Sequence, residues 1–308
     1  MEYKGIEYRK PVVHLINASG LGVAEYAART CYDSFDNSEN ENIKNFNELI
    51  NEDEEENEQE VEYLKSKISD IDDSALLDNL AWVYHHHSII EHSSLSFLIK
   101  GTSRGVLQEH ARHRIQSISV RSTRYTMADV INIFVASYFA KTTELEKTFL
   151  ELCEKHLQGL LVVDDAEYRE LEFKSIWNKL SYHVKMVREE EFLKMAVSKS
   201  SLELIDTMTF DPADRGAAED IFILLKNGKA KRNVGDPFKH IVSDNWSVDM
   251  VVTFNLRSLK NYFDLRDSGA AWFQIQWLAQ AMKDETPLKY LSLIDKKAKA
   301  EKEELAGE

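Results

Sequence analysis

The sequence predicts an α+β fold, in which a mainly antiparallel central sheet is flanked by helices and a long helical region packs on one side. Apolar residues alternate along the chain at 95–99 and at 248–254, as they do in strands with one buried face. Apolar residues recur at helical spacing at 22–31, and a long helical region is expected at about 142–205. The 308 residues include only 4 Pro and 11 Gly, which favours long helices and few tight turns.

The other elements follow from equally local signals. Residues 11–17 indicate a short strand, and Gly101 is expected to end the strand that begins near Leu95. Asn255 can cap the helix that follows the second alternating stretch. Further helices are predicted at 74–87, 102–111 and about 270–283.

Acidic residues concentrate in one segment, which runs from 36 to 62 and is dense in Asn, Glu and Asp. We interpret it as a solvated insertion or a mobile loop that buries no face, because so polar a composition offers little apolar surface. An acidic binding segment is the alternative. We expect one domain over 1–295 that carries this insertion, followed by a charged, frayed tail over 296–308.

Composition excludes several classes of protein. A formal net charge of -15 argues against a protein that coats nucleic acid, because phosphate binding needs positive charge. Two cysteines, Cys31 and Cys153, form neither a disulfide framework nor a CxxC motif, and their scarcity fits a reducing cytoplasm. No apolar run of about 18 residues is present, so no membrane span is expected. The charged N-terminus does not resemble a signal peptide.

Arginine residues gather in one short stretch, 104–124, in which Glu109 is the only acidic residue. Surface ion pairs with acidic helices explain this clustering poorly, because each stabilises by only about 0–1 kcal/mol. Arginine suits an anion site because its planar guanidinium pairs with phosphate through two hydrogen bonds. The arginines are Arg104, Arg112, Arg114, Arg121 and Arg124, and the neutral donors beside them are Ser117, Ser119, Ser122 and Thr123.

One motif in this stretch resembles a family signature. The string Arg-His-Arg-Ile-Gln-Ser-Ile-Ser-Val-Arg-Ser-Thr-Arg-Tyr at 112–125 resembles the signature of the flavin-dependent thymidylate synthases, which is Arg-His-Arg, seven residues, then Ser. Three further segments are similar to that family in the same order: Ala-Ala-Arg-Thr-Cys-Tyr at 27–32, His-His-Ser-Ile-Ile-Glu-His at 86–92, and Asn-Leu-Arg-Ser-Leu to Leu-Arg at 255–266. The resemblance covers about 11–35, 74–130 and 238–285.

The resemblance implies two sets of binding residues. The Arg-His-Arg segment binds FAD in this family, and the segment at 121–124 holds the phosphate of dUMP. Arg266 lies beside the uracil ring, where it stabilises developing negative charge and is the one catalytic residue implied. The FAD set is Ser88, Arg112, His113, Arg114, Val120, Asn255, Leu256, Arg257 and Asn261. The dUMP set is Glu109, Arg112, Arg121, Ser122, Thr123, Arg124, Lys239 and Arg266, with Arg232 as an alternative to Lys239.

The resemblance also implies the reaction. Methylenetetrahydrofolate supplies the carbon that converts dUMP to dTMP, NADPH reduces FAD, and FAD supplies the hydride. Neither cysteine stands in an activating setting, so no thiolate nucleophile is assigned. No metal is assigned either. The absence of a GxGxxG turn agrees with a flavin site that is not of the Rossmann type. A homotetramer with flavin sites shared between chains is expected, in the cytoplasm and without nucleic-acid or membrane partners.

Several positions depart from the family pattern or have simpler interpretations. Glu109 stands where the family often has Gln, Val120 where it has Glu, and Ala270 where it has His. Asn255 and Asn261 can be a helix cap and a surface residue, and Arg257 and Arg266 can pair with Asp264 or Asp267. Two other functions stay open: a metal-dependent hydrolase that uses His85, His86, His87, Glu91 and His92, and an RNA-binding module that uses the arginines at 104–124.

Overall fold

The computed structural model describes residues 2–3, 6–51, 58–157, 166–186 and 239–307. The chain divides into two compact units, which we name the helical unit and the sheet unit. The helical unit comprises 1–10, 101–107 and 120–249, and the sheet unit comprises 11–100, 108–119 and 250–308.

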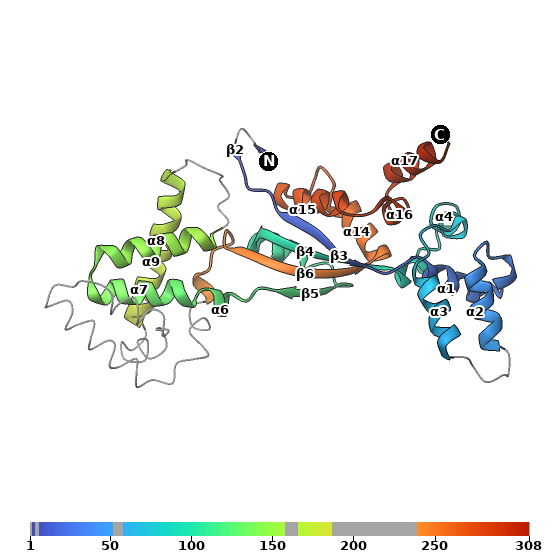
Figure 1. Ribbon diagram of the computed structural model, residues 1–308. Coiled ribbons are helices and arrows are strands. Elements are labelled where there is room, and N and C mark those ends of the chain that lie inside the picture. Colours follow the sequence, from blue (N-terminus) through green and yellow to red (C-terminus); the bar gives the residue numbers. More distant parts are fainter. Residues whose placement is uncertain (1, 4–5, 52–57, 158–165, 187–238, 308) are drawn as a thin grey trace. The chain divides into compact units, whose positions relative to one another are not determined.

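The sheet unit is built on a four-stranded antiparallel sheet with the strand order β3-β4-β6-β5. The buried side chains alternate along each central strand, so that Phe97 and Ile99 on β4 and Val252 and Phe254 on β6 are fully buried. Helices α14 (Leu256–Arg266) and α15 (Phe273–Asp284) lie along this face (Figure 1). The predicted α+β class is therefore confirmed. The strands are β3 Val12–Ala18, β4 Ser94–Ser103, β5 Ser117–Val120 and β6 Ser247–Asn255.

The predicted cap of α14 is present. The Asn255 side-chain oxygen accepts a hydrogen bond from the Ser258 backbone N–H at 2.8 Å, which satisfies one of the amides that a helix leaves unpaired at its start. One stripe of the helix, with Leu259, Tyr262 and Phe263, is buried. Arg257 lies at the start of the helix, and Arg266 lies at its end, one turn beyond Tyr262 on the same face.

The acidic segment is not the solvated insertion that composition indicated. It contributes α2 (Glu41–Asn51) and the start of α3 (Glu58–Ser69), while Glu54 to Glu56 lie outside the described residues. Ile43 is fully buried against Phe35 and Ile68, with Phe46 packed beside them. Ile43 and Phe46 are one helical turn apart, so they form an apolar stripe that average composition hides. The neighbouring helices are α1 Gly22–Tyr32 and α4 Ala75–Trp82.

Two glycines allow the start of α1 to pack closely on the end of α3. A Cβ atom at Gly20 would lie 1.7 Å from the Ser69 carbonyl oxygen, and one at Gly22 would lie 2.0 Å from the Ile68 carbonyl oxygen. Any side chain at either position therefore requires the two helices to move apart.

The C-terminal residues also fold more than expected. Instead of a frayed tail, Lys296–Gly307 forms helix α17. Ala298 is buried, and the Lys302 ammonium pairs with Asp73 at 2.8 Å and with Asp78 at 3.0 Å. These pairs join the helix to the segment that begins α4. Further short elements are η1 Phe35–Asn37, η2 Ile89–His92, α5 Arg104–His110 and α16 Leu288–Leu291.

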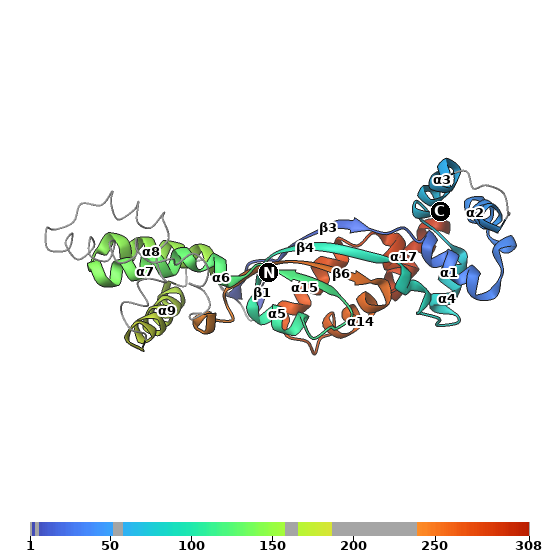
Figure 2. The same cartoon turned by 90° about the horizontal axis from the view of Figure 1, so that it is seen from below.

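The helical unit has its own core. Phe134 on α7, Phe149 on α8 and Trp177 on α9 pack as a ring cluster with centroid distances of 4.6 to 5.7 Å. The predicted helical region is confirmed over 143–156 and 166–186, and 187–205 lies outside the described residues. Figure 2 shows α7 and α8 side by side. The helices are α6 Thr123–Thr126, α7 Ala128–Ala140, α8 Thr143–His156 and α9 Ala166–Met186. The unit also contains the short elements β1 Glu2–Tyr3, β2 Ile6–Glu7 and η3 Lys239–Ile241.

Local boundaries differ slightly from the predicted ones. The helix expected at 74–87 ends at Trp82, and His85 adopts a positive φ of 55° that interrupts it. Gly101 has a φ of 69° but does not end β4, which continues to Ser103. In the part of the chain that the structure describes, no helix is both long and apolar enough to cross a membrane.

Candidate functional site

The sheet unit contains a polar pocket of about 750 Å³, which we name the arginine pocket. Three segments that are distant in sequence form it: η2, the loop between α5 and β5, and the exposed face of α14. Four guanidinium groups line it, and Glu91 is its one carboxylate among the described lining residues. Its lining residues are Glu91, Arg112, His113, Arg114, Ile115, Arg257, Ser258, Asn261, Leu265 and Arg266.

Arg266 is the most constrained of these arginines, with a side chain that is 15% exposed. Its Nε donates to Nε2 of His113 at 2.9 Å, and its Nη1 donates to Oε2 of Glu109 at 2.9 Å. Its Nη2 donates to the backbone carbonyl of Glu109 at 3.2 Å. An arginine has five N–H donors, so three have acceptors here and two remain for a ligand.

His113 accepts the Arg266 hydrogen bond, so its Nε2 carries no proton. Burial, together with the positive charges of Arg266 and Arg112, lowers the pKa of His113 to about 4, against a raising effect of Glu109. The ring packs edge-on against Tyr262, with 4.7 Å between centroids. A neutral histidine at this position leaves the positive charge of the pocket on the guanidinium groups.

Behind the pocket, His110 and Tyr262 form a buried pair. Both residues are fully buried, and Nδ1 of His110 lies 3.1 Å from the Tyr262 hydroxyl oxygen. Burial lowers the pKa of His110 to about 4, and the Gln116 side chain opposes this shift. The Gln116 amide donates to the carbonyl oxygens of His110 at 3.0 Å and His113 at 2.7 Å. These bonds fix the turn that carries the Arg-His-Arg motif.

Two other pocket arginines, Arg257 and Arg112, are paired with acids from a distant and a neighbouring segment. Arg257 lies 2.5 Å from Glu91, and Arg112 lies 3.4 Å from Glu109. The suggested pairing of Arg257 and Arg266 with Asp264 or Asp267 is therefore wrong. Those acids bind lysines instead, with Asp264 3.0 Å from Lys260 and Asp267 2.6 Å from Lys283. Lys260 is one helical turn from Asp264, whereas Arg257 is two turns away.

Not every residue of the implied FAD set faces this pocket. Leu256 is fully buried, and its backbone N–H donates to the Ser93 carbonyl at 2.9 Å. The Asn255 side chain serves as the helix cap described above. Ser88 is exposed at the start of η2, and Val120, the last residue of β5, is not among the residues that line the pocket. The structure brings Arg112, His113, Arg114, Arg257, Asn261 and Arg266 together.

The remaining residues of the implied dUMP set belong to the helical unit. Arg121 is held by Asp249, with 2.9 Å between Nη1 and Oδ2, and donates to the Ser247 carbonyl at 3.2 Å. Ser122 caps α6, Thr123 is buried, and Arg124 is exposed. Lys239 is exposed at the start of η3, while Arg232 lies outside the described residues.

The histidine-rich segment does not gather into a metal centre in the described chain. No group of three or more His, Cys, Asp or Glu side chains there is placed to hold a metal ion. His85 and His86 are exposed, and Nε2 of His87 lies 3.0 Å from the Ala81 carbonyl oxygen. Glu91 instead pairs with Arg257. The hydrolase hypothesis therefore has no support from these residues.

Sequence reasoning missed the structural roles of Glu91, Gln116 and Tyr262. A signal for Tyr262 was present, because it precedes Arg266 by four residues and so shares its face of α14. Gln116 and Glu91 had no comparable signal. Their partners lie in a turn and on a helix that only the folded chain places beside them.

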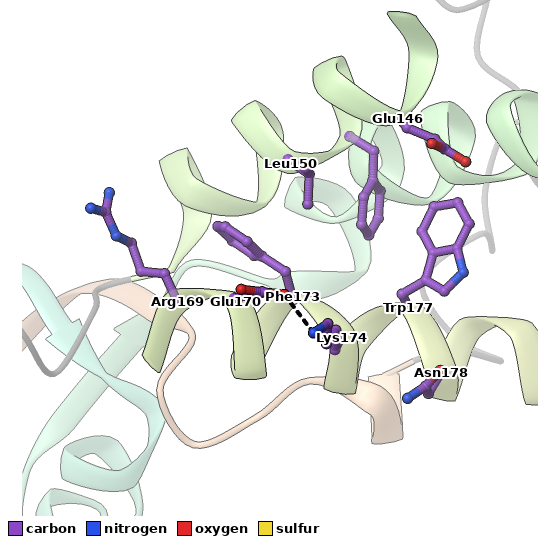
Figure 3. Close-up of a pocket in the computed structure, with 9 residues that line it drawn as sticks. Glu146, Leu150, Arg169, Glu170, Phe173, Lys174, Trp177 and Asn178 are labelled. Carbon is purple, nitrogen blue, oxygen red and sulfur yellow. Dashed lines mark ion pairs between the residues drawn. The ribbon is translucent and has the colours of Figure 1, made fainter. Parts of the chain in front are cut away.

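A second cavity, in the helical unit, differs in its chemistry. This aromatic groove of about 540 Å³ lies between α8 and α9, and Figure 3 shows Phe173 and Trp177 of α9 facing Leu150 of α8. Charged residues stand at its rim and pair with each other or with neighbouring helices. Glu170 lies 2.5 Å from Lys174, and Arg169 lies 2.6 Å from Glu154.

Comparison with known proteins identifies similar sequences over most of the chain. The model of a family described as thymidylate synthase complementing protein matches residues 14–288. The flavin-dependent thymidylate synthase of Helicobacter pylori strain 26695 is 26% identical over 275 residues, which cover 89% of this chain and 93% of that protein. The protein of the same name from Campylobacter jejuni strain RM1221 is 25% identical over 283 residues, with coverages of 92% and 95%.

Solved structures share the fold. Thymidylate Synthase X from Helicobacter pylori, crystallised with FAD and dUMP, aligns with a TM-score of 0.51 at 22% identity. The alignment covers 93% of this chain and 98% of that one. A second crystal structure of the same enzyme, also with FAD and dUMP, gives a TM-score of 0.52 over 92% of this chain.

Proposed function

Because the chain belongs to the thymidylate synthase complementing protein family, we propose that it is a flavin-dependent thymidylate synthase. It converts dUMP to dTMP, with methylenetetrahydrofolate as carbon donor and NADPH as the reductant of FAD. The observation that carries this proposal is the arginine pocket. The Arg-His-Arg motif and the distant Asn-x-Arg-Ser-Leu helix, which the sequence alone related to FAD, form one cavity there.

The donor set of the pocket fits FAD. The diphosphate of FAD needs cationic, forked donors, and Arg112, Arg114 and Arg257 supply them. Ser258 and Asn261 add neutral donors, and the exposed apolar side chains of Ile115 and Leu265 suit a flat ring. A volume of about 750 Å³ lies in the range of cofactor sites. When bound, FAD supplies the hydride that the pyrimidine ring receives.

Arg266 is the residue that we assign to charge stabilisation. Its two N–H donors without acceptors in the described chain are available to the uracil ring, where negative charge develops during reduction. The neutral state of His113 favours this role, because its ring accepts from the guanidinium without adding a second charge. We assign the dUMP phosphate to Arg124 and the Ser122 hydroxyl. Asp249 already holds Arg121, so that residue is assigned to the loop itself.

A thiolate nucleophile has no part in this proposal. Cys153 is fully buried in the helical core, and burial raises its pKa to about 12. Cys31 is exposed on α1. The thiolate is the reactive form of cysteine, so a raised pKa opposes nucleophilic attack. We further propose a homotetramer, because the cofactor and nucleotide segments lie far apart in the sequence. We propose a cytoplasmic location, because the scarcity of cysteines fits a reducing compartment.

A spectrum of the purified protein tests the proposal most simply. We expect flavin absorbance that bleaches with NADPH, and dTMP formation when dUMP and methylenetetrahydrofolate are added. The Cys31→Ser variant should form dTMP at the wild-type rate. A colourless protein with stoichiometric zinc would support a metal enzyme, and a colourless protein that shifts labelled RNA would support an RNA-binding module. A monomer that binds FAD tightly would contradict the shared site.

A further inference from the structure

We propose that Glu109 is a positioning residue, which acts on the reaction by fixing the guanidinium of Arg266 rather than by binding the nucleotide. This inference rests on the function proposed above. Glu109 supplies two of the three acceptors of Arg266, one from its side chain at 2.9 Å and one from its backbone carbonyl at 3.2 Å. Three hydrogen bonds from two residues hold the planar group in a single orientation.

The position of Glu109 in α5 explains why it can do this. It is the residue before the last one of that helix, so its carbonyl oxygen has no partner within the helix. Arg266 satisfies that oxygen, and a positive charge near a helix C-terminus is favourable. The next carbonyl, that of His110, accepts from the His113 backbone N–H at 3.2 Å and from the Gln116 amide at 3.0 Å. The C-terminal end of α5 therefore presents a free carbonyl oxygen to the last residue of α14.

The charges around Glu109 argue against a direct contact with nucleotide phosphate. Its Oε2 lies against Arg266 and its Oε1 lies 3.4 Å from Arg112, so each carboxylate oxygen already faces a cation. An ionised carboxylate is an acceptor only and repels a phosphate. The family often has Gln at this position, which keeps an acceptor there but not a charge. In this chain the carboxylate therefore orients Arg266 and also balances its charge.

His113 completes the constraint. It accepts from Nε, the donor that Glu109 does not reach, and its ring is held by Tyr262. Tyr262 and Arg266 are one turn apart on α14, so the two residues that fix His113 come from the same helix. The segment at 109–113 and helix α14 therefore hold each other in place through contacts among Glu109, His113, Tyr262 and Arg266.

A double-mutant cycle tests the proposal. We expect Glu109→Ala to lower kcat about tenfold or more while the KM for dUMP and the Kd for dUMP by calorimetry change less than about threefold. Glu109→Gln, which keeps an acceptor oxygen, should recover most of kcat. Because Glu109 acts through Arg266, the double variant Glu109→Ala/Arg266→Ala should be no slower than Arg266→Ala alone.

The matched control is Asp264→Ala, which removes an exposed carboxylate from α14 and should leave kcat and the KM for dUMP unchanged. A rise in the KM and Kd for dUMP at constant kcat would overturn the proposal, because it would mean that Glu109 contacts the nucleotide. The proposal would also be overturned if the double variant were slower than Arg266→Ala by the full factor that Glu109→Ala alone removes from kcat. A wild-type protein that forms no dTMP would instead reject the proposed function, which separates the two failures.

Discussion

The arginine pocket and the aromatic groove are both large enough for a ligand, at about 750 and 540 Å³. Their charged residues differ in origin. In the groove, Glu170 and Lys174 are one turn apart on α9, where such a pair stabilises the helix itself, and the other pair, Arg169 and Glu154, is separated by only 15 residues. In the pocket, Glu91 and Arg257 are separated by 166 residues, and Glu109 and Arg266 by 157.

This difference shows that the functional site is identified by how far apart in the sequence its paired charged residues lie, and not by the volume of the cavity. A pair within one helix needs no tertiary structure and can be explained by local stability. Four guanidinium groups from two distant segments repel one another unless acids or an anionic ligand balance them. The fold brings them together nonetheless, so the pocket indicates function while the groove indicates packing.

The largest effect that we expect lies in the groove and concerns stability. Phe149 is 1% exposed and packs on Phe134 and Trp177, so Phe149→Ala should lower the free energy of unfolding by about 3–5 kcal/mol. Urea unfolding measures this. At a temperature where the variant stays folded, its Kd for FAD should equal that of the wild type. A selective loss of FAD binding would break the comparison and make the groove a ligand site.

The next effect concerns catalysis in the pocket. Arg266→Ala should reduce methyl transfer by about 10²–10³-fold, the usual cost of removing a group that stabilises developing charge. FAD should stay bound, because three other arginines line the same cavity. Turnover and flavin absorbance on the same sample measure both quantities. Normal turnover would show that the charge-stabilising role is wrong.

The third prediction concerns His110, which lies behind the pocket and should make the free energy of unfolding depend on pH. The pKa of His110 is lowered to about 4 in the folded chain from an ordinary value of 6.5. The unfolded chain therefore binds a proton first as pH falls, and the free energy of unfolding drops between about pH 6.5 and 4. We expect His110 to contribute about 2 kcal/mol of this loss between pH 7.5 and 5.

The measurement is the unfolding midpoint at both pH values, in the wild type and in His110→Asn. Asparagine keeps a polar atom near the Tyr262 hydroxyl but does not titrate. The difference between the two pH values should therefore be smaller in the variant. Equal differences in both proteins would mean that His110 titrates normally when folded.

The sequence predicted those features whose physics is local. The Asn255 cap, the alternating strands and the helix of 256–266 each depend on residues within a few positions of one another. The acidic segment was misjudged because its composition was averaged, although Ile43 and Phe46 repeat at helical spacing. The partners of Arg257 and Arg266 could not be predicted, because only the folded chain places η2 and the end of α5 beside α14.

The smallest effect concerns the second part of the arginine-rich stretch, in the helical unit. Ser122→Ala removes a hydroxyl and should weaken dUMP binding by about 1 kcal/mol, or about fivefold, with a smaller change for FAD. Arg124→Ala should follow the same pattern. Calorimetric titration with each ligand measures the two affinities. Equal losses for dUMP and FAD would mean that this loop does not separate the two ligands.

The central claim, that the arginine pocket is the cofactor site, is tested most directly by FAD affinity in two matched variants. Arg257→Gln and Arg169→Gln each remove one exposed guanidinium paired with a glutamate, the first in the pocket and the second at the rim of the groove. We predict that Arg257→Gln raises the Kd for FAD at least about tenfold, while Arg169→Gln leaves it unchanged. An unchanged Kd in Arg257→Gln, or an equal rise in both variants, would contradict the claim.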